Sequence, residues 1–309
     1  MTYPAILRTS GDVEIFDPRM VPLASDESVL RRLGGGALWS EGPLYQHDGS
    51  VIWSDIPNNR ILRWSNGRVS EWMSPSNFTN GHTYDRQGRI IHCSHGARAI
   101  LRSELDGSMT TLVDRFEGKR LNSPNDVVVK SDGTIWFSDP PYGILSNHEG
   151  YKADSEQAGC FVYRFDPETK DLAAVITDMI CPNGLAFSPD ESLLYVSDTS
   201  INPYGKEGFH HIRVYDVTGE NATVNGRLFR VIEPGCSDGF RLDTDGNIFT
   251  SADDAIQVFA PDATFIGRIP VPEKVSNCCW GGPDRQTLFI TASTSLYAID
   301  LNASDVTRP

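Results

Sequence analysis

The chain has 309 residues, with 27 Lys and Arg against 41 Asp and Glu, which gives a formal net charge of −14. This charge disfavours nucleic acid and anionic membrane surfaces as partners, because both are themselves negative. No stretch has the roughly 18 apolar residues that a membrane-spanning helix needs. The first residues also lack the apolar run of a signal peptide, so we expect a cytoplasmic protein. The six cysteines show no Cys-x-x-Cys spacing, which argues against a disulfide framework or a zinc motif.

One pattern recurs six times along the chain. In its clearest copy Asn183 precedes a glycine and an apolar strand, the turn residue Asp190 follows seven positions later, and a second strand ends at Asp198. The six pairs of marked residues are Glu41 with Asp48, Asn80 with Gln87, Asn125 with Asp132, Asn183 with Asp190, Asp238 with Asp245, and Asn277 with Asp284. Repeats of this kind share one continuous core, so we expect a single domain over residues 1–309.

The spacing of the copies is close to the roughly 40 to 45 residues of a four-stranded propeller blade. In the first repeat we expect strands at 42–46, 51–55, 60–64 and 69–73, separated by turns rich in Asp, Asn, Gly and Pro. The sequence therefore predicts an all-β fold, a six-bladed β-propeller of four-stranded antiparallel blades. A β-sandwich, the other all-β fold considered, does not need so regular a repeat.

The later repeats are expected at 77–115, 121–179, 180–233, 235–273 and 274–302. The last of them is one strand short. We expect the N-terminal segment 1–33 to close or flank the last blade, with 12–16 supplying the missing strand, because closure removes an open sheet edge.

Two long insertions interrupt the third and fourth repeats, at 140–159 and 199–210. Both connect the second and third strands of their blades. Since strands in a blade alternate in direction, both insertions should overhang the end of the channel where the first marked residues lie. Long loops in compact domains often serve as functional lids.

The first marked residue of every repeat should line this end of the channel, and all six are oxygen donors. They are Glu41, Asn80, Asn125, Asn183, Asp238 and Asn277. Buried carboxylates need a cation or a dense hydrogen-bond network. Oxygen donors without thiolate or imidazole favour one divalent cation, Ca²⁺ first, with Mg²⁺, Mn²⁺ or Zn²⁺ as alternatives. The competing interpretation is that each Asn before Gly is only a turn residue.

The sequence resembles the gluconolactonase, regucalcin and senescence-marker-protein superfamily of six-bladed propellers, and the bacterial gluconolactonases in particular. The similarity extends over about 34–300. It is carried by Trp-Ser-Glu-Gly-Pro at 39–43, Lys-Arg-Leu-Asn-Ser-Pro-Asn-Asp at 119–126, Asp-Pro-Pro-Tyr-Gly at 139–143, Pro-Asn-Gly-Leu-Ala-Phe at 182–187 and Ser-Asp-Gly at 237–239. The resemblance implies a sugar lactonase in which Glu41, Asn183 and Asp238 hold a divalent ion. It also implies that Asn125 lies beside the ion and meets water or substrate.

Substrate contacts are less well defined. The regucalcin branch has an Arg two residues before the position of Asn125, which is thought to contact substrate hydroxyls, whereas this chain has Ser123. Arg120 is nearby and could substitute. His82 should share the channel face with Asn80, two residues before it, and Tyr142 lies on the first insertion. Other histidines, His95 among them, have no comparable pattern around them.

The leading hypothesis is a metal-dependent hydrolase that opens a gluconolactone-like aldonolactone to the hydroxy acid. The cation would stabilise the charge that develops on the carbonyl oxygen. Asp238 is the first candidate for general base, with Asp139 or Asp55 as alternatives. Asn125 would orient the water or hold the oxyanion. Two other hypotheses remain: a hydrolase of a non-sugar lactone or phosphotriester on the same scaffold, and a calcium-binding propeller without activity.

Overall fold

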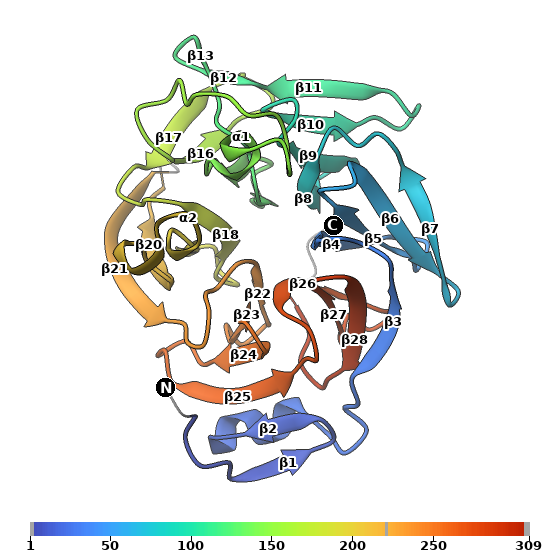
Figure 1. The fold of residues 1–309 in the computed structure, drawn as a ribbon. Coiled ribbons are helices and arrows are strands. Elements are labelled where there is room, and N and C mark those ends of the chain that lie inside the picture. The colour runs from blue at the N-terminus through green and yellow to red at the C-terminus, as the bar shows by residue number, and fades with distance from the viewer. Residues whose placement is uncertain (1–2, 220–221, 306–309) are drawn as a thin grey trace.

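The computed structural model describes residues 3–219 and 222–305. Their strands form six blades around a central channel, so the predicted six-bladed β-propeller is confirmed (Figure 1). Neighbouring strands of a blade are antiparallel. The first strand of each blade lies nearest the channel, and these inner strands contact one another in succession around it.

The first three blades follow the sequence order of their strands. Blade one comprises β4 (Ser40–Tyr45), β5 (Val51–Asp55), β6 (Arg60–Ser65) and β7 (Arg68–Met73). Blade two comprises β8 (Thr79–Tyr84), β9 (Ile90–Ser94), β10 (Ala99–Ser103) and β11 (Met109–Val113). A small hairpin of β12 (Arg115–Phe116) and β13 (Lys119–Arg120) precedes blade three, which comprises β14 (Val127–Val129), β15 (Ile135–Ser138), β16 (Val162–Phe165) and β17 (Leu172–Ile176).

Of the other three blades, the last two also include strands from the N-terminal end of the chain. Blade four comprises β18 (Pro182–Phe187), β19 (Leu193–Asp198), β20 (His211–Val217) and β21 (Thr223–Val231). Blade five comprises β22 (Phe240–Leu242), β23 (Ile248–Ser251), β24 (Ala255–Phe259) and β25 (Phe265–Pro270), extended outward by β2 (Val13–Ile15) and β1 (Arg8–Ser10). Blade six comprises β26 (Val275–Gly281), β27 (Thr287–Ala292), β28 (Ser295–Asp300) and β3 (Arg31–Gly35).

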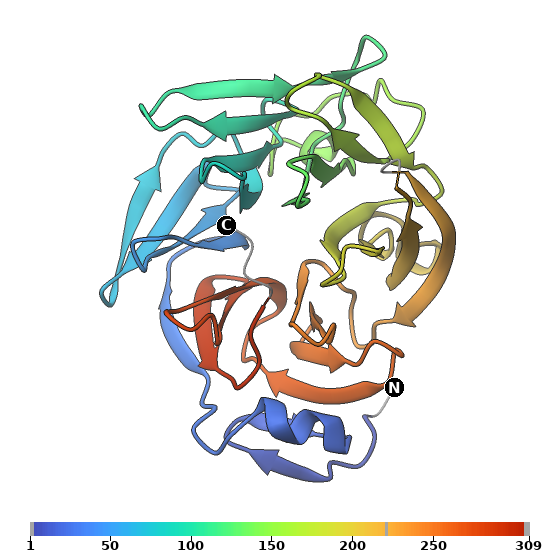
Figure 2. The ribbon, with the colours of Figure 1, turned by 180° about the vertical axis from the view of Figure 1, so that it is seen from behind.

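The ring closes differently from the sequence-based expectation. The segment 12–16 does not complete the last blade, because its strand β2 pairs with β25 of blade five instead. The closing strand is β3, which pairs with β28. Burial explains the choice. Val13 and Ile15 are fully buried in the cluster that joins blades five and six, whereas β3 begins with two exposed arginines. Both figures show β1 and β2 outside β25 (Figure 2).

The hydrophobic core lies mainly between adjacent blades. One cluster joins Ile91 of blade two to Phe137 and Tyr163 of blade three, and comparable clusters join the other neighbours. Packing blade against blade distributes the stability around the ring, so that polar side chains can occupy the channel without removing the main core. All six cysteines are free, as the sequence predicts. The single domain over 1–309 stays a prediction, since both ends lie outside the described residues.

The two insertions contain the short helices of the propeller. α1 (Tyr142–Leu145) belongs to the first, and α2 (Ile201–Tyr204) with the 3₁₀ turn η2 (Gly205–Glu207) to the second. A further 3₁₀ helix, η1 (Pro18–Leu23), packs beside β2 and β25. Both α1 and α2 stand on the face turned to the viewer in Figure 1, as expected for overhanging lids. Within the described ranges, no helix has the length and apolar character needed to cross a bilayer.

Candidate active site at the lid end of the channel

The six oxygen donors sit where the inner strands begin. Their repeat carries a second feature that the sequence did not reveal: in four blades the pairing of the first two strands shifts register beside the donor. These shifts lie at Glu41, Asn80, Asn183 and Asn277. Such irregularities bend a strand and re-aim its side chains, and they are common next to active sites. The bends therefore occur at the residues that ring the channel.

The glycine that follows several donors has a packing role. A Cβ on Gly81 would meet the backbone oxygen of Asn125 at 2.6 Å, and one on Gly184 would meet that of Asp238 at 2.2 Å. Instead the amide of Gly81 donates to Asn125 O at 2.8 Å and that of Gly184 to Asp238 O at 3.0 Å. Each glycine thus lets its blade bond to the donor residue of the next blade. The Asn-Gly pattern is a device that holds the ring together, as well as a turn.

Two carboxylates share the mouth of the channel. Burial raises the pKa of Glu41 well above its usual range, and the negative charge of Asp238 acts in the same direction. Burial also raises the pKa of Asp238 to about 7, with the charges of Glu149 and Asp126 acting in the same direction and that of Lys274 opposing them. A buried like-charged pair is costly unless a proton or a cation neutralises part of it.

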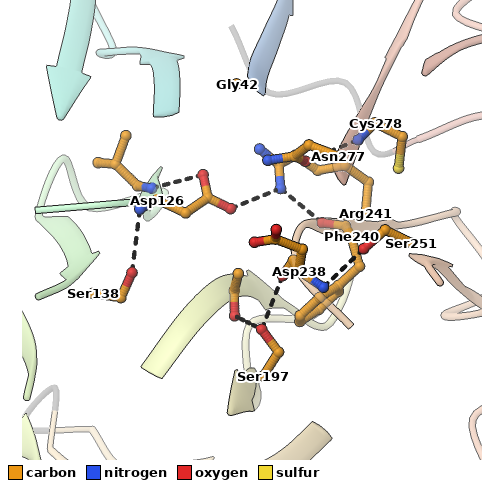
Figure 3. Close-up of polar contacts among 12 residues, drawn as sticks. Gly42, Asp126, Ser138, Ser197, Asp238, Phe240, Arg241, Ser251, Asn277 and Cys278 are labelled. Atoms are coloured by element: carbon orange, nitrogen blue, oxygen red, sulfur yellow. Dashed lines mark hydrogen bonds and ion pairs between the residues drawn. The ribbon is translucent and has the colours of Figure 1, made fainter. Parts of the chain in front are cut away.

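Hydrogen bonds fix the positions of Glu41 and Asp238. Glu41 Oε2 accepts hydrogen bonds from the amide of Gly42 at 2.9 Å and from Asn277 Nδ2 at 3.2 Å. The amide of Asp238 donates to Ser251 Oγ at 2.8 Å, and its carbonyl accepts from Ser197 Oγ at 2.9 Å. Figure 3 shows the Asp238 carboxylate free of these backbone contacts and turned toward the channel centre.

A partly buried ion pair crosses the channel close to the two acids. Arg241 Nη1 lies 3.4 Å from Asp126 Oδ2 and donates to the carbonyl of Phe240 at 2.7 Å (Figure 3). Asp126 follows Asn125 directly, and Arg241 is three residues beyond Asp238. The arginine is thus already matched by Asp126, and Glu41 and Asp238 keep an excess of negative charge at the mouth.

Asn183 and Asn125 differ in how their amides are used. Asn183 Nδ2 donates to Thr199 Oγ1 at 3.0 Å, and hydrogen bonding from Asn183 also reaches Asp238. Asn125 is held by its backbone, whose amide donates to Ser138 O at 2.9 Å. Within the part of the chain that the structure describes, no protein group bonds to the side-chain amide of Asn125. That amide is therefore available to a ligand.

The three expected substrate contacts have protein partners. His82 is buried, with one ring nitrogen 2.8 Å from Ser54 Oγ and the other 2.9 Å from His92 Nδ1. Arg120 Nη2 donates to the carbonyl of Ala97 at 2.6 Å. The hydroxyl of Tyr142 lies 2.6 Å from Thr199 Oγ1, so the first lid touches the start of the second. Their roles toward substrate stay predictions.

Two residues near the mouth were not singled out by the sequence. His95 Nε2 lies 3.4 Å from Asn80 Nδ2, and its Nδ1 lies 2.9 Å from the carbonyl of Glu149. Burial lowers the pKa of His95 to about 4 and raises that of Glu149. His95 follows the second strand of blade two, and Glu149 lies on the first lid. The length of that lid was the one sequence feature pointing to them.

In three blades, an Asp at the end of the second strand binds the backbone just before the first strand. Asp55 accepts from the amide of Leu38 at 2.9 Å, Asp139 from that of Asn122 at 2.7 Å, and Asp198 from that of Ile180 at 2.9 Å. Asp55 also pairs with Arg60 at 2.8 Å. These contacts show a structural role. Asp139 nevertheless keeps one oxygen without a partner among the described residues, and burial raises its pKa to about 7.

The opposite end of the channel is lined by different residues. A hollow of about 250 Å³ opens there, with Tyr45, His82, Arg241 and Trp280 among its lining residues. Among the described residues no cluster of three or more His, Cys, Asp or Glu side chains could hold a metal ion. The six donors that ring the lid end are two carboxylates and four amides, so any ion held by them would depend on both kinds of ligand.

Fold and site together define a six-bladed propeller with an oxygen-lined channel mouth under two lids. The model of the SMP-30/gluconolactonase/LRE-like family matches residues 39–294, and the chain belongs to this family. It is 31% identical to a gluconolactonase of Zymomonas mobilis, over 94% of this chain and 86% of that one. A pentonolactonase of Haloferax volcanii is 26% identical, over 86% and 85%. The solved structure of a gluconolactonase from Xanthomonas campestris has a TM-score of 0.85 at 38% identity, covering 96% of this chain and all of the other.

Proposed function

We propose that this protein is a hydrolase of sugar lactones, with its active site at the lid end of the channel and one divalent cation bound there. The observation that carries the proposal is the pairing of Glu41 with Asp238 at one mouth, beside the amides of Asn183 and Asn125. Support for the substrate class comes from relatives that act on gluconolactone and pentonolactone by name.

The donor set fits a divalent cation. Burial and mutual repulsion disfavour the ionised forms of Glu41 and Asp238, and the nearest arginine, Arg241, is matched by Asp126. Lys274 is likewise paired with Asp253 at 3.3 Å. A cation held by Glu41, Asn183 and Asp238 would offset the remaining negative charge. Carboxylate and amide oxygens suit Ca²⁺ best, with Mg²⁺, Mn²⁺ and Zn²⁺ as alternatives.

The bound cation would polarise the lactone carbonyl, a contribution worth several kcal/mol. The chain's own residues do the rest. Asn125 donates from its unoccupied amide to the carbonyl oxygen, where negative charge develops. Asp238 takes a proton from the attacking water as the new C–O bond forms. The ring C–O bond then breaks, and the departing ring oxygen receives that proton, so that the product is the open hydroxy acid.

A substrate panel tests this function. Protein treated with chelator would be assayed on gluconolactone, a pentonolactone, an aliphatic lactone and a phosphotriester, each corrected for spontaneous hydrolysis. We expect little turnover until Ca²⁺, Mg²⁺, Mn²⁺ or Zn²⁺ is restored, and then the highest kcat/KM on one of the sugar lactones. Preference for the phosphotriester or the aliphatic lactone would move the enzyme to another ester class. Cation binding without turnover of any of the four would indicate a binding protein.

A further inference from the structure

We propose that Thr199, held in turn by Tyr142, is a positioning residue that sets the orientation of the Asn183 side chain at the cation site. The inference rests on the proposed function, because it assigns a role toward the ion held there. It concerns a residue that is not among the six oxygen donors and that follows the end of β19 directly.

One assignment of the protons satisfies all three hydrogen bonds among these groups. Tyr142 Oη lies 3.0 Å from the carbonyl oxygen of Thr199, which can only accept, so the phenol donates there. The phenol oxygen also lies 2.6 Å from Thr199 Oγ1, and it can accept the proton of that hydroxyl. With its proton used, Thr199 Oγ1 is left as an acceptor for Asn183 Nδ2, 3.0 Å away.

This assignment, together with the hydrogen bond from Asn183 to Asp238, determines which atom of the amide is left for a cation. If the Asn183 amide were reversed, its carbonyl oxygen would face a hydroxyl oxygen that has no proton to give. The bonded arrangement therefore uses the two hydrogens of Nδ2 on Thr199 and Asp238, and it leaves Oδ1 without a partner among the described residues, available as an oxygen ligand. Only the oxygen of an amide binds a hard cation such as Ca²⁺, so the orientation decides whether Asn183 can be a ligand.

The backbone around Thr199 is fixed. Its amide donates to the carbonyl of Cys181 at 3.1 Å, and the next amide, of Ser200, donates to Asp198 Oδ1 at 2.9 Å. Thr199 is fully buried. Its hydroxyl is therefore held in place by blade four from below and by the lid of blade three through Tyr142. Hydrogen bonds from residues outside the ligand set orient metal ligands in proteins.

Blade one offers an internal comparison. There the residue after Asp55 is Ile56, which has no hydroxyl, and the donor of that blade is Glu41. The two oxygens of a carboxylate are chemically equivalent, so Glu41 can offer an oxygen whichever way it turns. An amide has two different ends, and of these two blades the one that supplies the amide ligand carries a hydroxyl at this position.

The test measures Ca²⁺ affinity by titration calorimetry on chelator-treated protein, alongside kcat/KM. Thr199→Val keeps the shape of the side chain and removes the hydroxyl, and we expect it to weaken Ca²⁺ binding about 10- to 100-fold. Thr199→Ser restores the hydroxyl and should recover most of the affinity. Tyr142→Phe should have a smaller effect than Thr199→Val and should add nothing to it in the double variant, because the tyrosine acts through the threonine.

Thr134→Val is the matched control. Thr134 is also buried and hydrogen-bonded, to Asp132 and Trp136, but it lies at the other end of blade three. It should lose stability without losing Ca²⁺ affinity. Unchanged affinity in Thr199→Val, or additive losses in the double variant, would overturn the positioning role. If Thr199→Val does not fold, Tyr142→Phe and Thr199→Ser still decide it. Wild-type protein that binds no divalent cation would instead refute the proposed function, and this inference with it.

Discussion

The two ends of each inner strand carry recurring polar residues, yet they use them in opposite ways. At the turn after the strand, Asp48 accepts bonds from Ser50 N at 3.0 Å and Ser50 Oγ at 2.6 Å, and Asp190 binds Ser192 in the same manner. Such bonds lower the pKa of both aspartates, that of Asp48 through Ser50 and that of Asp190 through Ser188 first and then Ser192. At the lid end, burial raises the pKa of Glu41 and Asp238.

The difference shows that recurrence alone does not identify a site. Both sets of residues repeat with the blades, and the turn aspartates bind groups two residues away in their own loops, with Arg63 as a further partner of Asp48. The acids of the mouth have only part of their hydrogen-bonding capacity met and are brought together from different blades. A recurring carboxylate indicates chemistry when the fold buries it next to another of the same charge.

The largest expected effect comes from changing the two acids at the channel mouth. Glu41→Gln and Asp238→Asn each remove one negative ligand, and we expect Ca²⁺ affinity and kcat/KM to fall by more than the roughly 10- to 100-fold typical of residues that only support a ligand. Asp190→Asn, at a turn, is the matched control and should change neither. Calorimetry and steady-state kinetics measure both. Near-normal turnover in Glu41→Gln would show that the ligand set is wrong.

The second effect separates Asn125 from the proposed ligands. Asn125→Ala removes a donor to the developing negative charge, and we expect kcat to fall about 100-fold. Ca²⁺ affinity should stay close to that of the wild type, because Asn125 is not placed among the ligands. A loss of affinity as large as that of Asp238→Asn would instead make Asn125 a ligand.

The third effect is a pH dependence of the cation-free protein. The pKa of Asp238 is raised from 3.8 to about 7, chiefly by burial. Between these values the folded state holds a proton that the unfolded state has lost, so this contribution to stability is present below about pH 4 and disappears as the pH rises through 7. Thermal unfolding from pH 4 to 8 should show a smaller decline for Asp238→Asn than for wild type.

Asp139 provides a control for that experiment. Burial raises its pKa to about 7 as well, but its carboxylate is tied to the amide of Asn122, outside the proposed ligand set. Saturating Ca²⁺ should therefore remove the part of the decline that depends on Asp238 and leave the part that depends on Asp139. A decline that is identical in wild type and Asp238→Asn would contradict the assignment.

The smallest effect concerns the turns. Asp190→Ala removes the bonds to Ser188 and Ser192, and we expect the free energy of unfolding to fall by about 1 kcal/mol, a typical net value for such hydrogen bonds. Catalysis and Ca²⁺ affinity should be unchanged. Denaturant titration measures the loss. A large drop in kcat/KM would show that the two ends of the strands are not independent.

The sequence predicted the six blades, the phase of the donor ring and the side on which the lids lie, because all three follow from the repeat. It did not predict the closing strand, since the two arginines and the glycine run around β3 lack the alternation that marked 12–16. Nor did it show that Asp126 meets Arg241 or that Tyr142 meets Thr199. Those contacts join different blades, and a one-dimensional pattern does not state which side chains meet across a channel.

The most direct test of the account is the stoichiometry of cation binding and its link to turnover. Chelator-treated wild-type protein would be titrated with Ca²⁺ by calorimetry while lactone hydrolysis is followed in the same samples. The account predicts one ion per chain, with activity returning in proportion to the occupied sites. Full activity in protein shown to be free of divalent cations would contradict it.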